Sequence, residues 1–321
     1  MTRNQNCHNQ TAHIWTRELV LSMAIPHITM AVVSVVFNSA VILAVACTKD
    51  LQKPIFLLFC NLALSDLLSS ASGFWVAIFF MRDPQSTVVG SRKLLRLYAF
   101  YAVPILATIY NLVAIGVERY LALAEKRWTR RRITRNQVLG IVVVIWLVAL
   151  FLGFLPLMGW NCLGTDNVST LYSPLCVNYL AFITIPHSAV SFLLPFFTYL
   201  SIILTLRKHK ISMGALGQAR STGRLAEIQV ARTSIVIWIT ALLSYLPFFV
   251  AVVLDLAMPH CPRDLPLGLY VFRNLTAMMI AINSLGNPIV YTLNVKRLGR
   301  RIKALKQPSI NRIDVQVVEK I

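Results

Sequence analysis

Long apolar runs alternate with short polar stretches along most of the chain. Seven of the runs reach the length, about 20 residues, that a helix needs to cross a hydrocarbon core about 30 Å thick. The stretches between them are short, which favours one compact helical bundle. We therefore predict an all-α membrane protein with spans near 22–47, 54–80, 94–123, 137–159, 180–206, 230–257 and 267–292.

The composition supports a membrane protein. Of the 321 residues, 57% are hydrophobic and only 13% are charged, and the formal net charge is +19. A soluble protein of this length needs more charged residues to cover its surface. A strongly basic balance is also typical of nucleic-acid binding. The basic residues gather between the apolar runs, however, so we expect no nucleic-acid partner.

The distribution of positive charge predicts the orientation. Placing the N-terminus outside puts 22 of the 31 lysines and arginines on the cytoplasmic side, as the positive-inside rule requires. We predict a multi-pass plasma-membrane protein with an extracellular segment 1–21, a bundle 22–292 and a cytoplasmic segment 293–321. The first 21 residues lack the pattern of a cleavable signal peptide. Asn9 and Asn167 begin glycosylation sequons that this orientation places outside.

Four cysteines also fall on the outer side, where disulfides persist. They are Cys7, Cys162, Cys176 and Cys261, and four cysteines allow three pairings. Cys162 and Cys176 flank one loop, and closing a loop of that length contributes about 3 kcal/mol in the chain-entropy estimate. We predict that these two are joined, which leaves Cys7 and Cys261 as a second pair that the sequence does not establish.

Polar residues inside the spans are few, so each needs a reason. Asp66 lies about 18 Å into the second span. Taken singly, such residues are typical of contacts between membrane helices. Together with an ionisable aspartate, they predict a hydrated internal site for a small cation, because a carboxylate at mid-membrane needs a cation or proton beside it. We expect a sodium ion near Asp66, Asn38, Thr108, Asn283, Ser284 and Asn287.

Nearly every span carries a short motif, and these motifs occur in a recognisable order between about Asn38 and Leu305. The sequence resembles the rhodopsin-like G-protein-coupled receptors, whose fold is a seven-helix bundle with a short amphipathic eighth helix. The motifs that carry the resemblance are "NLALSDLL" with Asp66, "GVERYLAL" with Glu118, Trp146, Pro195, "SYLPF" with Pro247, and "NSLGNPIVY".

The resemblance implies a switch at the cytoplasmic end of the third span. In that family the arginine of the "ERY" triplet is held by the neighbouring acid, and often by a second acid at the foot of the sixth helix. Outward movement of the sixth helix frees the arginine and opens a cavity for the G protein. Expected partners are a heterotrimeric G protein, arrestin and a receptor kinase. The implied switch residues are Glu118, Arg119, Tyr120, Glu227, Asn287, Pro288 and Tyr291.

Two further features refine the resemblance. Leu298, Ile302 and Leu305 fall on one face of a basic segment, which suits an amphipathic helix on the membrane surface. The family's usual cysteine at the outer end of the third helix would fall near Leu94 and is missing. "LMGWNC" followed by Cys176 instead resembles the sphingosine-phosphate, lysophosphatidate and cannabinoid receptors, whose second loop closes on itself. The sequence thus resembles the wider branch of lysophospholipid, cannabinoid, adenosine and melanocortin receptors.

The resemblance also implies an apolar ligand pocket. The third span offers no aspartate for an amine, the seventh offers no lysine for a retinal Schiff base, and Val252 replaces an asparagine that adenosine receptors carry. A lipid or another hydrophobic ligand remains. Arg96 or Arg273 would meet an acidic head group, unless these arginines only snorkel to the interface. The implied lining is Tyr101, Ile105, Tyr245, Phe248, Phe249, Val252, Arg273, Ala277 and Ile280.

Three other functions predict features of their own. A transporter or channel predicts internal repeats, interrupted helices or rings of pore charges, and an intramembrane hydrolase predicts paired catalytic carboxylates or H-E-x-x-H. The sequence has none of these features, so we expect no enzyme activity, no cofactor and no metal other than sodium. The alternative within the same fold is a chemosensory receptor, because "LQKPIFLLFCNLALSD" resembles a stretch of odorant receptors.

Overall fold

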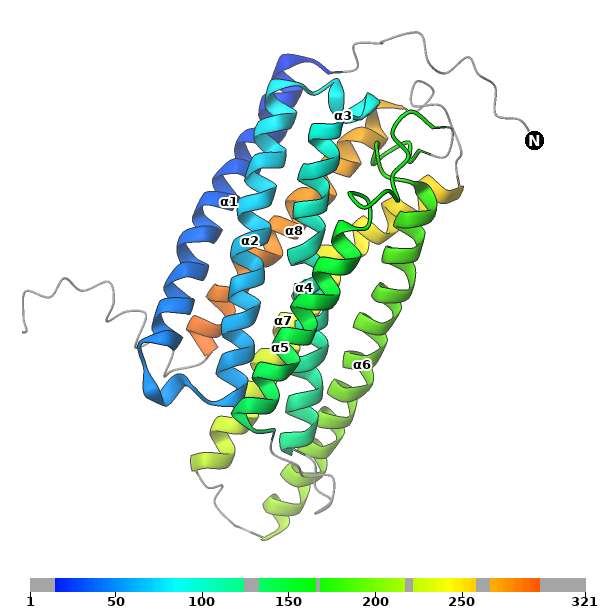
Figure 1. Cartoon of the computed structure of the whole chain (residues 1–321). Coiled ribbons are helices and arrows are strands. Elements are labelled where there is room, and N and C mark those ends of the chain that lie inside the picture. Colours follow the sequence, from blue (N-terminus) through cyan, green and yellow to red (C-terminus); the bar gives the residue numbers. More distant parts are fainter. Residues whose placement is uncertain (1–14, 124–132, 166–167, 217–221, 258–265, 295–321) are drawn as a thin grey trace, which may run out of the picture.

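The computed structural model describes residues 15–123, 133–165, 168–216, 222–257 and 266–294. These residues form helices that run up and down the molecule (Figure 1), with a single isolated β-bridge between Val168 and Cys176. The predicted all-α bundle is confirmed. The long helices are α1 (Arg17–Ala46), α2 (Pro54–Arg82), α4 (Arg92–Leu123), α5 (Arg135–Phe154), α6 (Val177–Leu216), α7 (Thr222–Ala257) and α8 (Leu267–Asn294); η2 (Lys49–Leu51) and α3 (Ser86–Val89) are short.

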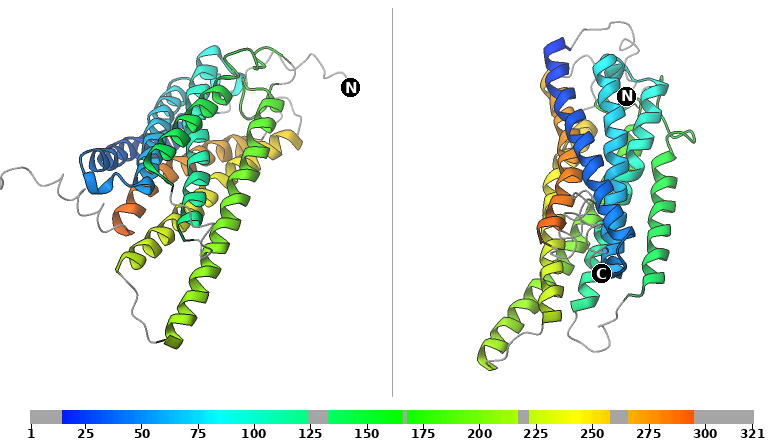
Figure 2. Two further views of the ribbon diagram at one scale, coloured as in Figure 1. Left: turned by 60° about the horizontal axis from the view of Figure 1, so that its bottom comes forward. Right: turned by 90° about the vertical axis from the view of Figure 1, so that its left-hand side faces the viewer.

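Helix α4 lies at the centre of the bundle and packs against α2, α5, α6 and α7. Helix α1 packs against α2 and α8, and α8 packs against α7, so the surrounding helices close into one body (Figure 2). The segment 155–176, which we call the α5–α6 loop, lies at the same end of the bundle as the start of α1 (Figure 1). We call this end the loop end and the other the opposite end.

Six of the described helices are long and apolar enough to cross a membrane, and α8 is the long helix that does not qualify. Its polar side chains lower its hydropathy, but they face the interior: Arg273 is 5% exposed, and Asn283 and Asn287 are fully buried. Helix α8 therefore belongs to the bundle because of its packing, although these side chains lower its hydropathy.

Several helix ends differ from the predicted spans because local capping decides them. Helix α1 begins at Arg17, inside the predicted outer segment, since the Thr16 hydroxyl accepts a hydrogen bond from the Leu19 amide. Helix α5 begins after a capping box at Thr134. It ends at Phe154 rather than at residue 159, because Pro156 has no N–H to donate to the Leu152 carbonyl, which accepts from the Tyr179 hydroxyl instead.

Helices α4 and α5 approach each other closely near Pro104. This proline lacks the N–H that would bond to the Phe100 carbonyl, and the Ser72 hydroxyl of α2 donates to that carbonyl at 3.3 Å. Beside it, Gly153 of α5 lies against Val103, where a Cβ would come within 2.6 Å of a Val103 methyl group. The close packing of these two helices therefore depends on the absence of a side chain at residue 153.

At the opposite end, α6 and α7 extend past the other helices (Figures 1 and 2). Helix α6 has 40 residues, and its sequence becomes basic from Arg207. Some predicted features fall outside the described residues. These are Asn9, Asn167, Cys7, Cys261 and the amphipathic eighth helix with Leu298, Ile302 and Leu305.

Candidate functional site

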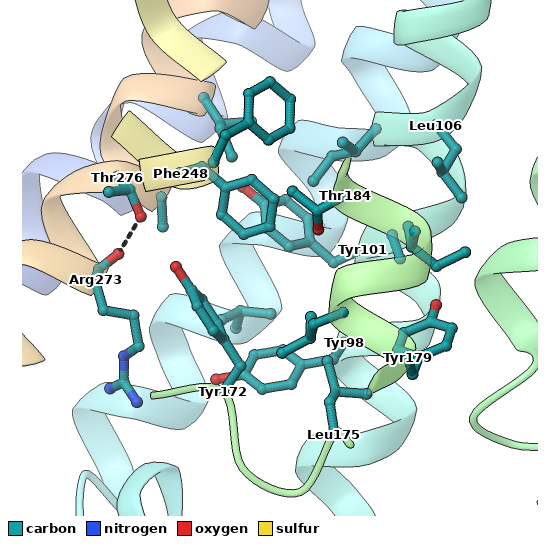
Figure 3. Close-up of a pocket in the computed structure, with 18 of the residues that line it drawn as sticks. Tyr98, Tyr101, Leu106, Tyr172, Leu175, Tyr179, Thr184, Phe248, Arg273 and Thr276 are labelled. Atoms are coloured by element: carbon teal, nitrogen blue, oxygen red, sulfur yellow. Dashed lines mark hydrogen bonds between the residues drawn. The ribbon is translucent and has the colours of Figure 1, made fainter. Parts of the chain in front are cut away.

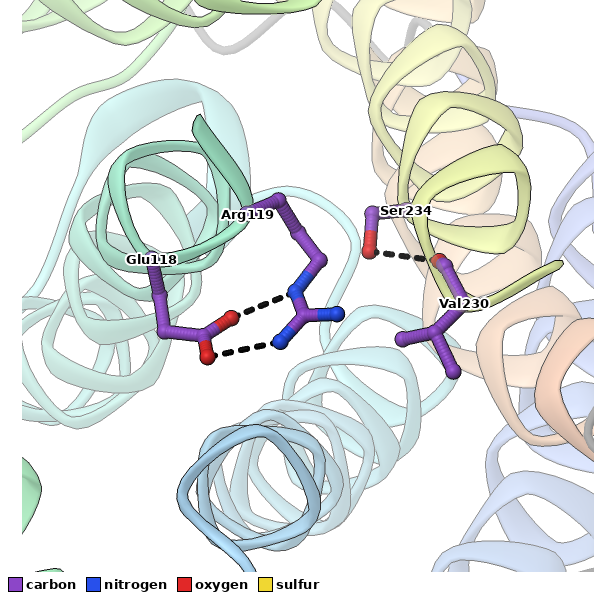
Figure 4. Close-up of polar contacts among 4 residues, drawn as sticks. All are labelled: Glu118, Arg119, Val230 and Ser234. Carbon is purple, nitrogen blue, oxygen red and sulfur yellow. Dashed lines mark hydrogen bonds and ion pairs between the residues drawn. The ribbon is translucent and has the colours of Figure 1, made fainter. Parts of the chain in front are cut away.

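Glu118 and Arg119 form a buried ion pair near the opposite end of α4. The Arg119 Nε lies 2.5 Å from Glu118 Oε2, and its Nη2 donates to Oε1 at 2.6 Å. The two residues are 6% and 2% exposed. Figure 4 shows the guanidinium between Glu118 and the part of α7 that carries Val230 and Ser234. A pair buried this deeply leaves an uncompensated charge when one partner is removed, which costs several kcal/mol.

The other predicted switch residues lie in different surroundings. Tyr120 is 38% exposed. Glu227 lies on α7, the helix that Arg119 faces, but its side chain is outside the described part. Tyr291 is buried and its ring stacks on Phe59 at 5.3 Å. Asn287 and the helix-interior Pro288 are part of the next cluster, nearer the middle of the bundle.

A buried polar cluster surrounds Asp66 at the meeting of α1, α2, α4 and α8. The Asn287 side-chain amide donates to Asp66 Oδ2 at 2.8 Å, and the Asn38 amide donates to the Ser284 carbonyl at 3.0 Å. Thr108 donates to Ser65 at 2.9 Å. All six residues of the predicted sodium site are at most 1% exposed.

Several oxygens in this cluster have no hydrogen-bond partner among the described residues. They include one carboxylate oxygen, three amide oxygens and a hydroxyl: Asp66 Oδ1, Asn38 Oδ1, Asn283 Oδ1, Asn287 Oδ1 and Ser284 Oγ. Buried polar atoms need partners, and carboxylate, carbonyl and hydroxyl oxygens are the donor set that hard cations prefer. The residues therefore fit a small hard cation. No group of three or more His, Cys, Asp or Glu side chains suited to another metal occurs in the described part.

A cavity of about 140 Å³ lies towards the loop end, between α2, α4, α6, α7, α8 and the α5–α6 loop (Figure 3). Its walls are mostly aromatic and aliphatic. The predicted residues that line it are Tyr101, Ile105, Phe248, Phe249, Arg273, Ala277 and Ile280, and the additional ones include Tyr98, Leu106, Ile109, Tyr172, Leu175, Tyr179, Ile183, Thr184, His187 and Thr276.

Two predicted lining residues are not part of the cavity wall. Tyr245 is 1% exposed and packs in the core with its ring stacked on that of Phe249. Val252 packs into the apolar cluster around Leu171 of the α5–α6 loop. In this structure Tyr245 therefore belongs to the core between the helices, and Val252 to the packing beneath the loop.

The α5–α6 loop folds over the cavity. The predicted disulfide between Cys162 and Cys176 is present, with the two Cα atoms 4.9 Å apart. The loop also presses on the α2–α4 connection, where the Ser173 hydroxyl donates to the Val89 carbonyl at 3.0 Å. Gly90 has φ +87°, and a Cβ there would collide with the Ser173 hydroxyl. The loop is thus a fixed cover.

Two charged residues hold this cover, and only one of them was predicted. Asp255 of α7 accepts hydrogen bonds from the Ser169 hydroxyl at 2.5 Å and from the Thr170 and Leu171 amides at 3.0 and 3.1 Å. Sequence analysis missed it because its partners are mainly loop amides, which leave no sequence pattern. Asp255 is 5% exposed, so Asp66 and Glu118 are not the only acids buried in the bundle.

Arg273 is the second residue that holds the cover. It donates to the Thr87 and Leu171 carbonyls, both at 2.9 Å, and to the Thr87 hydroxyl at 3.1 Å. Its guanidinium also lies 5.4 Å from the centre of the Tyr270 ring. Arg273 is 5% exposed, so it does not snorkel to solvent, whereas Arg96 is exposed and does not line the cavity.

Comparison with known proteins places these sites in context. The sequence profile described as "7 transmembrane receptor (rhodopsin family)" matches residues 37–291. Lysophosphatidic acid receptor 1-B of Xenopus laevis is 24% identical over 282 residues, covering 87% of this chain and 74% of the relative. Sphingosine 1-phosphate receptor 1 of Danio rerio is 25% identical over 272 residues, covering 82% and 72%. The crystal structure of squid rhodopsin has a TM-score of 0.72 at 20% identity, covers 90% of this chain and 86% of that chain, and shows the fold.

Proposed function

Because the chain belongs to the rhodopsin family of seven-transmembrane receptors, we propose that it senses a lipid-like ligand in the cavity at the loop end. Binding there activates a heterotrimeric G protein at the opposite end. The chain is a G-protein-coupled receptor of a multi-pass membrane type, not an enzyme. The relatives named above are receptors for lysophosphatidic acid and sphingosine 1-phosphate, so they favour a lipid over the chemosensory alternative.

The observation that carries the lipid proposal is the cavity wall. It is built almost entirely of apolar and aromatic side chains, with Arg273 as its one Lys or Arg among the described residues. Burial of an alkyl chain against such a wall contributes about 0.8 kcal/mol per CH₂ group. A cation beside an apolar cavity suits an amphiphile with an acidic head group.

The Arg119–Glu118 pair supplies the switch in this proposal. In the resting receptor Glu118 holds Arg119 near the part of α7 that carries Val230. Outward movement of the extended end of α7 would release Arg119 for the G protein, with Glu227 as a second acid that restrains it. Arrestin and a receptor kinase are proposed as further partners at the same end, and the gathering of positive charge supports a cytoplasmic location for it.

The polar cluster around Asp66 supplies a second way to regulate signalling in this proposal. A sodium ion bound by Asp66 and its unpartnered neighbours would stabilise the resting arrangement, because the ion supplies the positive charge that the buried carboxylate lacks. Asn287 both bonds to Asp66 and precedes Pro288, so occupancy of the site is coupled to the shape of α8.

The test is lipid-stimulated nucleotide exchange with receptor in vesicles and several purified G proteins. Lysophosphatidic acid, sphingosine 1-phosphate, a long-chain fatty acid and a monoglyceride are the ligands. We expect at least one lipid to raise exchange in the wild type and not in Ala277→Trp, which fills the cavity. Val253→Trp, on the exposed face of α7, is the control. An equal lipid response in Ala277→Trp would contradict a ligand site in this cavity.

A further inference from the structure

Arg273 has hydrogen-bonding capacity left over in the cavity wall. A guanidinium has five N–H donors, and three are used by the Thr87 carbonyl, the Leu171 carbonyl and the Thr87 hydroxyl. Among the described residues, two donors remain. Two N–H groups of one guanidinium match the two oxygens of one carboxylate.

The charge of Arg273 is also left without a paired acid. A guanidinium stays protonated in proteins, and burying it without an anion is costly. Asp255 lies nearby but makes no ion pair with Arg273 in the described part. Instead, Leu171 separates them: its amide donates to Asp255, and its carbonyl accepts from Arg273. Asp255 is already bonded to three loop donors.

Arg273 and Asp255 together limit the negative charge that a bound ligand can carry. Arg273 compensates one negative charge. A second negative charge would find no other Lys or Arg in the described cavity wall and would be repelled by the Asp255 carboxylate on the other side of Leu171. A phosphate monoester carries between one and two negative charges at neutral pH, whereas a fatty carboxylate carries one.

Tyr172 provides a neutral hydrogen-bond donor in the same cavity wall as Arg273. Its hydroxyl is buried, belongs to the cavity wall and has no hydrogen-bond partner among the described residues. Figure 3 shows Tyr172, Thr276 and Arg273 on one side of the cavity, with Leu106 and Tyr179 on the other. Arg273, Thr276 and Tyr172 therefore lie on one side. The opposite wall offers Leu106 and Ile183 to an apolar tail, with Thr184, His187 and Ser188 of α6 beside them.

We propose that the cavity selects a lipid with a singly charged head group, as a long-chain carboxylate has, held by Arg273 and the Tyr172 hydroxyl. This rests on the proposed function and narrows its ligand class. A phosphate monoester with the same chain would bind more weakly, because its extra charge is uncompensated.

The first test compares three lipids that share an oleoyl chain. Oleate, oleoyl lysophosphatidic acid and monoolein compete for purified receptor against a fluorescent stearate at neutral pH. We expect oleate to bind at least tenfold more tightly than either of the others. Tighter binding of the phosphate monoester, or equal binding of neutral monoolein, would overturn the proposal.

Variants then separate charge from structure. Arg273→Gln should weaken oleate binding at least tenfold, while Asp255→Asn should strengthen it severalfold, because it removes a negative charge and keeps an acceptor for the loop amides. If the two residues only held the α5–α6 loop, both variants would weaken binding. Arg96→Gln, which removes an exposed charge outside the cavity, should leave the affinity unchanged.

A milder variant covers the case in which Arg273→Gln does not fold. Tyr172→Phe removes one hydroxyl and should weaken oleate several-fold without changing monoolein; an unchanged ratio would contradict the head-group assignment. The binding assay needs no G protein. A receptor that responds to other lipids but does not prefer oleate would refute this inference alone, and oleate binding with no exchange response to any lipid would refute the proposed function.

Discussion

The Asp66 side chain is fully buried among the helices. One of its carboxylate oxygens is bonded to Asn287 and the other has no partner in the described residues. We predict that replacing an organic cation by sodium at constant ionic strength lowers basal nucleotide exchange in the wild type. Asp66→Asn should remove this sodium effect, because the amide carries no charge to hold the ion.

Asp83→Asn is the control for this prediction. Asp83 is an exposed acid at the end of the same helix, where it caps Ser86, so its loss changes the charge without touching the cluster. Sodium sensitivity that persists in Asp66→Asn would mean that the cluster only joins the helices.

Arg119 gives a second prediction at this scale. Arg119→Ala should abolish G-protein coupling and leave ligand binding largely intact. Glu227→Ala should act in the opposite direction and raise basal exchange, because it removes one acid that restrains Arg119. A change of about 1.4 kcal/mol in a two-state equilibrium shifts the populations tenfold. Both variants are measured at matched surface expression. G-protein coupling that survives Arg119→Ala would show that the Arg119–Glu118 pair is only a structural salt bridge.

The sequence predicted some of these residues and not others for a physical reason. Glu118 and Arg119 are adjacent in the chain, so the motif itself contains the pair. Asp255 accepts hydrogen bonds from amides 84 and 85 residues away. Almost every residue has a backbone amide, so no sequence motif marks these partners. Tyr172 lines the cavity only because the α5–α6 loop turns inward.

At the scale of helices, the contact between α4 and α5 gives a sharp prediction. Gly153→Ala should lower the thermal stability of the receptor, by about 1–3 kcal/mol, because its Cβ meets both the side chain and the backbone of Val103. Melting of the purified receptor measures this.

Gly140→Ala on the same helix is the matched control. A Cβ there has nothing within 4 Å, so only helix propensity changes, and that favours alanine by up to about 1 kcal/mol. Equal melting temperatures for the two variants would show that the helices are free to separate at Gly153.

The positions of the helices were predictable, but their ends and close contacts were less so. Apolar runs mark what lies in the membrane, and they located all seven long helices, including α8, although its polar side chains lower its hydropathy. They could not show that α6 continues to Leu216, because that extension needs no apolar face. Helix α5 ends after Phe154 because of Pro156. This is a local effect, and hydropathy averaged over a span does not show it.

Across the whole molecule, one helix connects the three sites. Helix α4 carries Tyr101 and Ile105 in the cavity wall, Thr108 in the polar cluster, and Arg119 at the opposite end. From Ile105 to Arg119 the helix rises about 21 Å. A ligand in the cavity and a G protein at Arg119 would therefore act on opposite parts of one continuous helix, with the Asp66 cluster between them.

The orientation is the whole-molecule prediction. An epitope placed before Met1 should be stained by antibody on intact cells, and one placed after Ile321 only after permeabilisation. The physical reason is the excess of lysine and arginine on the predicted cytoplasmic side. Vesicles of known sidedness provide the control, and the reverse staining pattern would place the cavity in the cytoplasm and contradict the proposed function.

The bond between Ser169 and Asp255 sets an order of events during biosynthesis. Ser169 completes the predicted sequon at Asn167, and in the folded receptor its hydroxyl is fully buried and donates to Asp255. The enzyme that attaches the sugar needs the sequon exposed. A glycan at Asn167 must therefore be added while the chain is still being made, before α7 emerges to supply Asp255, and a receptor that has already folded will not acquire it.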